Sequence, residues 1–324
     1  MAGDEWYKDV VFYQIWPRSF ADGNGDGIGD LYGVYEKLNY VKSLGVGGIW
    51  FSPLYVSPNA DFGYDIADYR RISPDYGDEK IFRRVLDRAH ELGLKVIMDL
   101  VINHTSIEHE WFRKGIDPAS PYHDYYIWRA PAPDGGVSNN WQSMFGGPAW
   151  TYNEENGQYY LHLFSAGQPD LNMDNPRVRD EVKDVMRYWL DMGVDGFRED
   201  VITLISKAEG LPNDRGPLSL PKGRQYYDCG PHLADYLGEF RHDVLAQHDC
   251  FVVGEAPFVD VEKARMLTQG PRESRLLDMV FSFEHMEADC LFTEYIPLPF
   301  SPRRLMRALS RWQDGLHGVG WNAL

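Results

Sequence analysis

Short apolar runs alternate with amphipathic stretches along the first third of the chain. Residues 10–15, 47–51 and 95–100 are rich in β-branched and aromatic residues, which is typical of strands. Between the first two runs, Val34, Leu38 and Val41 recur at helical spacing. Between the last two, Asp78 is a candidate N-cap and Gly93 a terminator for a helix with one apolar face: Ile81, Phe82, Val85, Leu86 and Ala89.

The regular pattern stops after His104 and returns at Asp174. Residues 105–173 carry many Pro, Gly, Asn and aromatic residues, with one strand-like piece at 159–164. Asn175 and Pro176 then favour a helix start, and Gly193 favours its end. Three more strands are predicted further along the chain, at 194–198, 250–254 and 279–283.

Strands that alternate with helices favour a parallel sheet. The six visible βα units predict an α/β fold, a (β/α)8 TIM-type barrel that is incomplete at its C-terminal side. We expect residues 1–104 to be the first part of the barrel, 105–173 an inserted loop-rich subdomain, and 174–324 the continuation, ending before strand 7.

Composition narrows the class of protein. The 324 residues are 44% hydrophobic, which is enough for a large core, and no apolar run is long enough to span a bilayer. A net charge of −17 argues against nucleic acid or a membrane surface as a partner. The three cysteines form no CxxC pair, so neither a disulfide framework nor a zinc site is indicated, and we expect a soluble cytoplasmic protein.

Carboxylates follow several of the predicted strands. Asp200 follows one strand with Arg198 two residues before it, and Glu255 follows the next. Any one such carboxylate is as easily a helix N-cap or a surface ion pair. Together, two carboxylates on neighbouring strands and a cation provide a nucleophile, a general acid and a charge that keeps the nucleophile ionised.

These segments resemble the ordered signature regions of the α-amylase family, glycoside hydrolase family 13. The similarity begins at Tyr13-Gln-Ile-Trp-Pro-Arg18, and the strings QPDLN and GDGIGD are most similar to the oligo-1,6-glucosidase and α-glucosidase branch. The resemblance implies that Asp200 is the nucleophile and Glu255 the acid/base of a retaining α-glucosidase. It also implies a substrate-binding set consisting of Asp61, Tyr64, His104, Phe145, Phe164, Gln168, Arg198 and Val201.

The resemblance implies a substrate as well. A pocket closed by Phe145 and Phe164 implies exo action on short oligosaccharides or disaccharides, and valine at position 201 implies a preference for α-1,6 linkages. Other members of the branch remain alternatives: an α-1,4-glucosidase, a trehalose-phosphate hydrolase or a sucrose isomerase. A non-catalytic barrel that serves as an interaction module is the alternative from another class. The retained Asp200 and Glu255 argue against that module.

A glycine-rich loop near the N-terminus suggests a metal site. Oxygen donors stand at positions 1, 3, 5, 7 and 9 of a loop similar to an EF-hand, in the order Asp22, Asn24, Asp26, the Ile28 carbonyl and Asp30. Position 12 is Gly33, so the EF-hand is incomplete, and a turn closed by side-chain hydrogen bonds is the alternative. The family's calcium loop at this place favours one structural Ca²⁺, and no organic cofactor is expected.

Two features depart from the family. Glu199 stands between Arg198 and Asp200, where this branch often has an apolar residue, and its direction is open. The family's third catalytic carboxylate, an aspartate after a histidine on strand 7, has no counterpart up to Leu324. We therefore expect the 324-residue chain to be inactive alone and the full-length protein to be a monomer.

Overall fold

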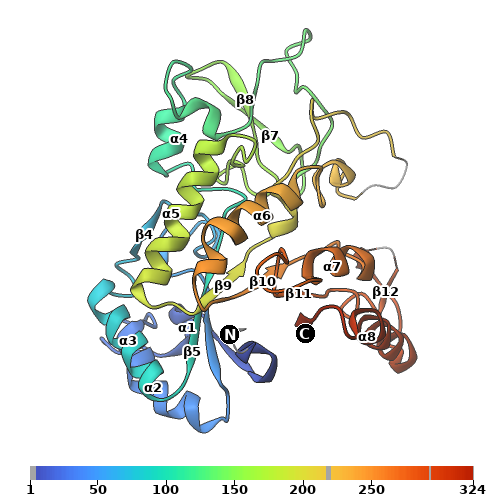
Figure 1. The fold of residues 1–324 in the computed structure, drawn as a ribbon. Coiled ribbons are helices and arrows are strands. Elements are labelled where there is room, and N and C mark those ends of the chain that lie inside the picture. The colour runs from blue at the N-terminus through green and yellow to red at the C-terminus, as the bar shows by residue number, and fades with distance from the viewer. Residues whose placement is uncertain (1–4, 217–219, 292, 324) are drawn as a thin grey trace.

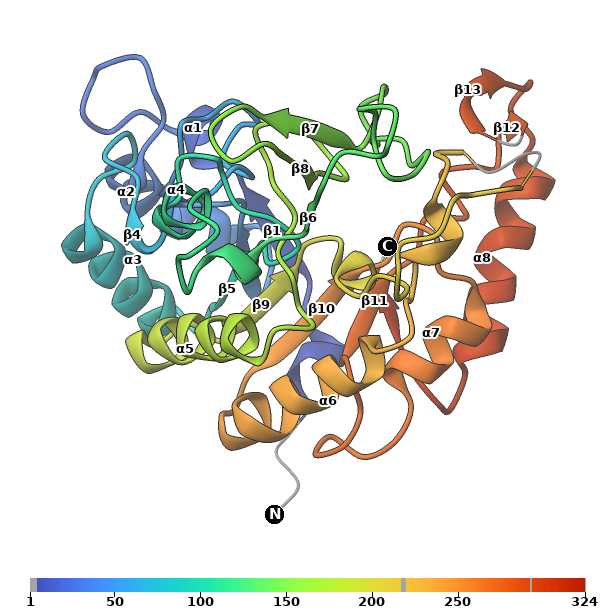
Figure 2. The ribbon, with the colours of Figure 1, turned by 90° about the horizontal axis from the view of Figure 1, so that it is seen from above.

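A seven-stranded parallel sheet forms the centre of the molecule. The computed structural model describes residues 5–216, 220–291 and 293–323. The sheet has the order β1 (Phe12–Ile15), β2 (Gly48–Phe51), β5 (Lys95–Leu100), β9 (Gly196–Glu199), β10 (Phe251–Glu255), β11 (Met279–Phe281) and β14 (Asn322–Ala323). Every neighbouring pair is parallel, and in Figure 2 the strands follow an arc. An open arc of sequential parallel strands is an incomplete barrel, as predicted.

Helices cover the outer side of this arc (Figure 2). They are α2 (Leu31–Ser43), α3 (Glu79–Glu91), α5 (Pro176–Met192), α6 (Leu233–Asp243), α7 (Val261–Thr268) and α8 (Pro302–Leu316). The predicted signals act locally: Asp78 and Asn175 cap α3 and α5 through their side chains, and Gly193 ends α5 at φ 111°. The predicted apolar face of α3 is buried against the sheet.

The sheet has one strand more than the six that the sequence predicted. Asn322 and Ala323 pair with Val280 and Phe281 of β11. The expectation that the chain ends before strand 7 was therefore wrong by two residues. So short a strand carries no alternation that could distinguish it from a loop.

The insertion forms its own small sheet. Strands β6 (Trp128–Arg129), β8 (Gln158–Leu161) and β7 (Trp150–Asn153) are antiparallel, and α4 (Glu110–Gly115) lies beside them at the top of Figure 1. The strand expected at 159–164 thus begins one residue earlier and ends at Leu161.

Minor elements complete the described chain: η1 (Trp6–Asp9), α1 (Pro17–Phe20), β3 (Tyr55–Val56), β4 (Asp68–Ile72), η2 (His123–Tyr125), η3 (Ile202–Leu204), η4 (Arg224–Tyr226), η5 (Leu245–Gln247), β12 (Cys290–Leu291) and β13 (Thr293–Pro297). None of the helices in the described ranges combines the length and the apolar content that crossing a bilayer requires.

The main core lies between the strands and their helices, and the fully buried Trp189 of α5 is one of its largest side chains. Burial of that apolar layer holds each strand in register, so the C-terminal ends of the strands present their side chains at fixed positions.

Candidate active site

One arginine gathers three carboxylates from three strands. Arg198 of β9 donates from Nη1 to Asp99 at the end of β5 and, at 2.6 Å, to Oδ1 of Asp200. Its Nη2 lies 2.8 Å from Oε2 of Glu255 at the end of β10. Strand alternation puts residues 198 and 200 on the same face, and the parallel register places Asp99 and Val253 on either side of Arg198.

Burial raises the pKa of both catalytic candidates. Burial raises the pKa of Asp200 to about 6, although Arg198 lowers it. Burial and the neighbouring Asp200 raise the pKa of Glu255 to about 7. A hydrogen bond between the two carboxyls works in opposite directions, lowering the pKa of Asp200 and raising that of Glu255. The hydrogen bond thus favours the ionised form of Asp200 and the protonated form of Glu255.

The backbone beside the nucleophile is strained. Val201 has φ 37° and ψ 38°, a left-handed conformation that is unfavourable for a β-branched residue. In this conformation its N–H donates to Oε2 of Glu255 at 3.0 Å. The predicted site residue Val201 thus contacts the acid through its backbone.

A second polar group brings together side chains from the loops after β3, β5 and β8. Gln168 Nε2 donates to Oδ2 of Asp61 at 2.8 Å and lies 3.1 Å from Nε2 of His104. Tyr64 donates to Asp99 at 3.4 Å, and its carbonyl lies 3.2 Å from His104 Nε2. Tyr64 therefore joins this polar group to the carboxylate cluster.

Burial lowers the pKa of His104 and raises that of Asp61. A neutral imidazole, an amide and a carboxylate in contact form a surface that hydrogen-bonds to neutral hydroxyl groups.

The two predicted aromatic wall residues lie beside this group. The Phe164 ring is 5.1 Å from the His104 ring, and Phe145 meets Phe164 edge-on at 5.7 Å. Phe145 is 62% exposed, which leaves apolar ring surface available to a ligand. All ten predicted catalytic and substrate-binding residues thus lie in connected groups at one end of the sheet.

Residues 14–324 match the family described as alpha amylase, catalytic domain. The chain belongs to the α-amylase family. It is 49% identical to an oligo-1,6-glucosidase of Heyndrickxia coagulans over 99% of this chain and 58% of that protein.

Two solved structures are also similar to this chain. A trehalose-6-phosphate hydrolase of Bacillus licheniformis superposes with a TM-score of 0.94 at 42% identity, covering 99% of this chain and 57% of that one. The trehalulose synthase of Pseudomonas mesoacidophila MX-45 gives 0.94 at 39%, with the same coverage. The chain thus spans less than two thirds of the length of these relatives.

The sequence analysis did not identify some residues that contact the site residues of this α-amylase-type site and hold them in place. The buried Lys207 lies 2.9 Å from Asp170 and donates at 2.9 Å to Asn103, the neighbour of His104. Trp50 Nε1 donates to Asp99 at 3.0 Å. No local pattern distinguishes Lys207, whereas Asp99 has the signal of a charge at a strand end.

The predicted calcium loop is closed by its own backbone. Asp22 accepts from Gly25 at 2.6 Å and Gly27 at 2.8 Å, and Asp26 accepts from Ile28 at 2.8 Å. Asp30 caps α2 by accepting from Gly33 at 2.7 Å, and Asn24 accepts from Asp26 at 2.9 Å. No group of three or more His, Cys, Asp or Glu side chains suited to a metal occurs within the described ranges. Ca²⁺ prefers oxygen ligands of this kind, but in this structure they accept hydrogen bonds from the backbone of the turn.

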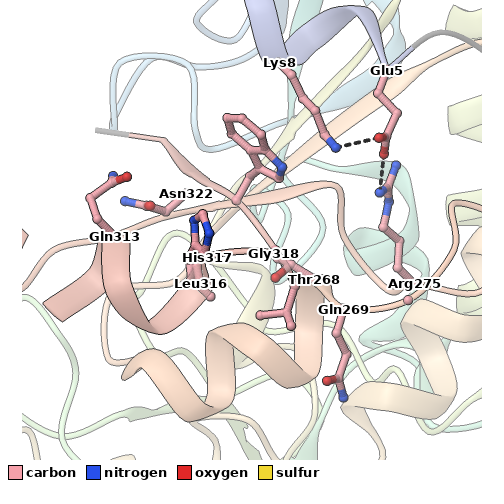
Figure 3. Close-up of a pocket in the computed structure, with 14 residues that line it drawn as sticks. Glu5, Lys8, Thr268, Gln269, Arg275, Gln313, Leu316, His317, Gly318 and Asn322 are labelled. Atoms are coloured by element: carbon pink, nitrogen blue, oxygen red, sulfur yellow. Dashed lines mark hydrogen bonds and ion pairs between the residues drawn. The ribbon is translucent and has the colours of Figure 1, made fainter. Parts of the chain in front are cut away.

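A cavity of about 960 Å³ lies elsewhere. It is bordered by Glu5 and Lys8 near the N-terminus, by His317 after α8 and by β14 (Figure 3). None of the residues predicted to bind sugar lines it. Because it holds no cluster of catalytic carboxylates, we assign the active site to the strand ends and not to this cavity.

Proposed function

We propose that the natural protein carrying this chain is a retaining α-glucosidase that acts on the non-reducing end of short α-glucosides in carbohydrate catabolism. One observation carries the proposal: Arg198 contacts both Asp200 and Glu255, and the hydrogen bond between these two carboxyls lowers the pKa of Asp200 and raises that of Glu255. A non-catalytic interaction module has no need of a buried ion cluster, which is costly to assemble.

The reaction follows from these roles. Asp200 Oδ attacks the anomeric carbon and forms a glucosyl ester while Glu255 gives its proton to the departing glycosidic oxygen. Glu255, now ionised, takes a proton from water, and the resulting hydroxide attacks the same carbon and releases Asp200. Arg198 keeps Asp200 ionised before the attack and again after its release. Asp61, Gln168 and His104 are placed to hold the hydroxyl groups of the glucose.

We infer a preference for α-1,6 over α-1,4 linkages. The support is Val201, buried beside Glu255, and the similarity to proteins named oligo-1,6-glucosidase. Steric discrimination of this kind amounts to ~1 to 3 kcal/mol. Two other functions remain second candidates because similar structures carry these names: hydrolysis of a phosphorylated disaccharide, as in the trehalose-6-phosphate hydrolase, and isomerisation of sucrose, as in the trehalulose synthase.

We also propose one structural Ca²⁺ at Asp22–Asp30, a cytoplasmic location and a monomeric full-length protein. Five oxygen donors within nine residues support the ion, and the scarcity of cysteines supports the location. The proposed partner is a neutral sugar, because the chain carries a net charge of −17.

The test compares kcat/KM for isomaltose, maltose, sucrose and trehalose 6-phosphate with the natural full-length protein. We expect isomaltose to be the best substrate and α-glucose to be the first anomer released. Faster hydrolysis of maltose contradicts the linkage preference. β-Glucose as first product contradicts the retaining mechanism.

A further inference from the structure

A buried aspartate with no predicted role lies in the loop that carries two of the proposed sugar-binding residues. This loop joins β3 to β4 and includes Asp61 and Tyr64. Asp65 follows Tyr64 directly, and its side chain is 1% exposed. Burial of a carboxylate is unfavourable unless other groups compensate it, so the partners of Asp65 show what it holds in place.

Three donors of the same loop satisfy the Asp65 carboxylate. Its Oδ1 accepts from Ser57 Oγ at 2.8 Å and from the Asp61 amide at 3.1 Å, and its Oδ2 accepts from the Ala60 amide at 2.9 Å. The Ser57 hydroxyl oxygen in turn accepts from the Asn59 amide at 2.9 Å. Through these hydrogen bonds one side chain holds the backbone from residue 57 to residue 61.

The same stretch of backbone is strained. Asn59 and Phe62 have φ 60° and 48°, in the left-handed region that is unfavourable for a bulky side chain such as phenylalanine. Phe62 and Gly63 form the centre of a tight turn, which the Tyr64 amide closes by donating to the Asp61 carbonyl at 3.0 Å. Such a backbone persists only where its surroundings impose it, and strain of this kind clusters at ligand-binding sites.

The two ends of this turn contact the other polar residues of the proposed site. Asp61 Oδ2 accepts from Gln168 at 2.8 Å, and the Tyr64 carbonyl lies 3.2 Å from His104 Nε2. Both contacts require the turn to keep its shape. Relaxation of the strained backbone would therefore displace Asp61 and Tyr64 together.

We propose that Asp65 is a positioning residue for sugar binding: it holds the loop of residues 57–65 in its strained shape and thereby places Asp61 and Tyr64 against the non-reducing glucose. Because Asp65 is buried against its own loop, it acts through these two residues and not on the substrate. The effect on turnover rests on the proposed glucosidase function, whereas the hold on the loop does not.

The first test is Asp65→Asn in the natural full-length protein. An asparagine has the same size, but whichever way its amide turns, its NH₂ group faces a backbone N–H donor, of either Ala60 or Asp61. The loop should relax, and misplacement of the sugar-binding groups should lower kcat/KM for an α-glucoside by about 10²-fold. Ser57→Ala leaves both backbone hydrogen bonds to Asp65 intact, so its loss should be smaller.

The matched control is Asp278→Asn. Asp278 is also 1% exposed and also accepts from a backbone amide, that of Val252 at 2.9 Å, but it precedes β11 at the opposite end of the sheet from the proposed site. This variant should lower Tm and leave kcat/KM unchanged. A comparable loss of kcat/KM in Asp278→Asn shows a general effect of stability and overturns the positioning role.

A double-mutant cycle with Asp61→Asn separates positioning from a merely structural role. If Asp65 acts through Asp61, Asp65→Asn should reduce kcat/KM by about tenfold or less in a protein that already carries Asp61→Asn. A further loss of about 10²-fold in that background, equal to the loss in the wild type, overturns the proposal.

Hydrogen exchange of the peptide with residues 57–65 tests the hold on the loop without any activity. Asp65→Asn should exchange faster there than the wild type, and Asp278→Asn should not. Equal exchange in the wild type and Asp65→Asn overturns the hold. A natural protein that hydrolyses no α-glucoside contradicts the proposed function instead, and the exchange experiment still decides the role of Asp65 in the loop.

Discussion

Two acidic regions of this molecule differ in how their carboxylates are held. Asp99, Asp200 and Glu255 come from three strands and meet on one buried guanidinium. The acids of the Asp22–Asp30 loop are neighbours in sequence and bond to the amides of their own turn. Burial raises the pKa of Asp200 and Glu255, whereas backbone amides lower that of the exposed Asp22.

The contrast separates chemistry from structure. Acids that are held by amides stay ionised across the physiological range and serve a turn or a metal. Carboxyl groups whose pKa burial has raised toward 7 can exchange protons during a reaction. The strand-end group should therefore control turnover, and the loop should control only stability.

Arg198→Leu gives the largest expected effect. It removes the cation that compensates three buried carboxylates, so kcat/KM should fall by about 10³-fold or more. Arg198→Lys keeps the positive charge but not both guanidinium donors, so its loss of kcat/KM should be smaller. Arg179→Leu is the matched control, because Arg179 pairs with Glu239 on the outer helices. A comparable loss of kcat/KM in the control contradicts the special role of Arg198.

The pH profile should be bell-shaped. Activity needs Asp200 ionised and Glu255 protonated, so it declines as pH falls below about 6 and as it rises above about 7. Beyond each limb, the decline is about tenfold per pH unit. Glu255→Gln should lose the alkaline limb. A wild-type optimum above pH 8 or below pH 5 would count against this assignment.

Lys207→Met should have an intermediate effect. It removes the cation behind Asp170 and Asn103 and loosens the support of His104. Because the sugar is then bound less tightly, KM should rise by about tenfold, in line with the loss of a hydrogen bond to a charged group. Lys114→Met, which removes an exposed pair with Glu110 in the same insertion, should leave KM unchanged. Equal KM values in both variants would remove Lys207 from the site's support.

The loop should give the smallest effect on activity. Ca²⁺ at 100 times its Kd should raise Tm by a few degrees, since binding adds about 2.7 kcal/mol to stability. Asp26→Ala should abolish that rise and leave kcat unchanged. If Ca²⁺ does not change Tm or calorimetry detects no binding, the calcium proposal fails.

The sequence predicted the βα order and the first six strands because buried strands and amphipathic helices differ in the period of their apolar residues. It could not predict β14, whose two residues have no period. It also predicted that Asp200 and Glu255 stand at the ends of neighbouring strands, and in the structure both contact Arg198. Their catalytic roles stay predictions.

The surroundings of the site were less predictable. Lys207 reaches Asn103 and Asp170 from distant parts of the chain, and no sequence spacing indicates that contact. The direction of Glu199 depends on the phase of β9, which only the contacts of Arg198 settle. Contacts between side chains far apart in the sequence depend on how the chain packs, and a single sequence does not show that packing.

Trapping of the covalent intermediate tests the central claim most directly. A fluorinated α-glucosyl fluoride that forms the glucosyl ester quickly and hydrolyses slowly should be incubated with the natural full-length protein, which is then digested and analysed by mass spectrometry. We predict one glucosyl adduct per protein, on the peptide that contains Asp200, and its absence in Asp200→Asn. An adduct on Glu255, or no adduct in a protein that turns over glucosides, would contradict the assignment of Asp200 as nucleophile.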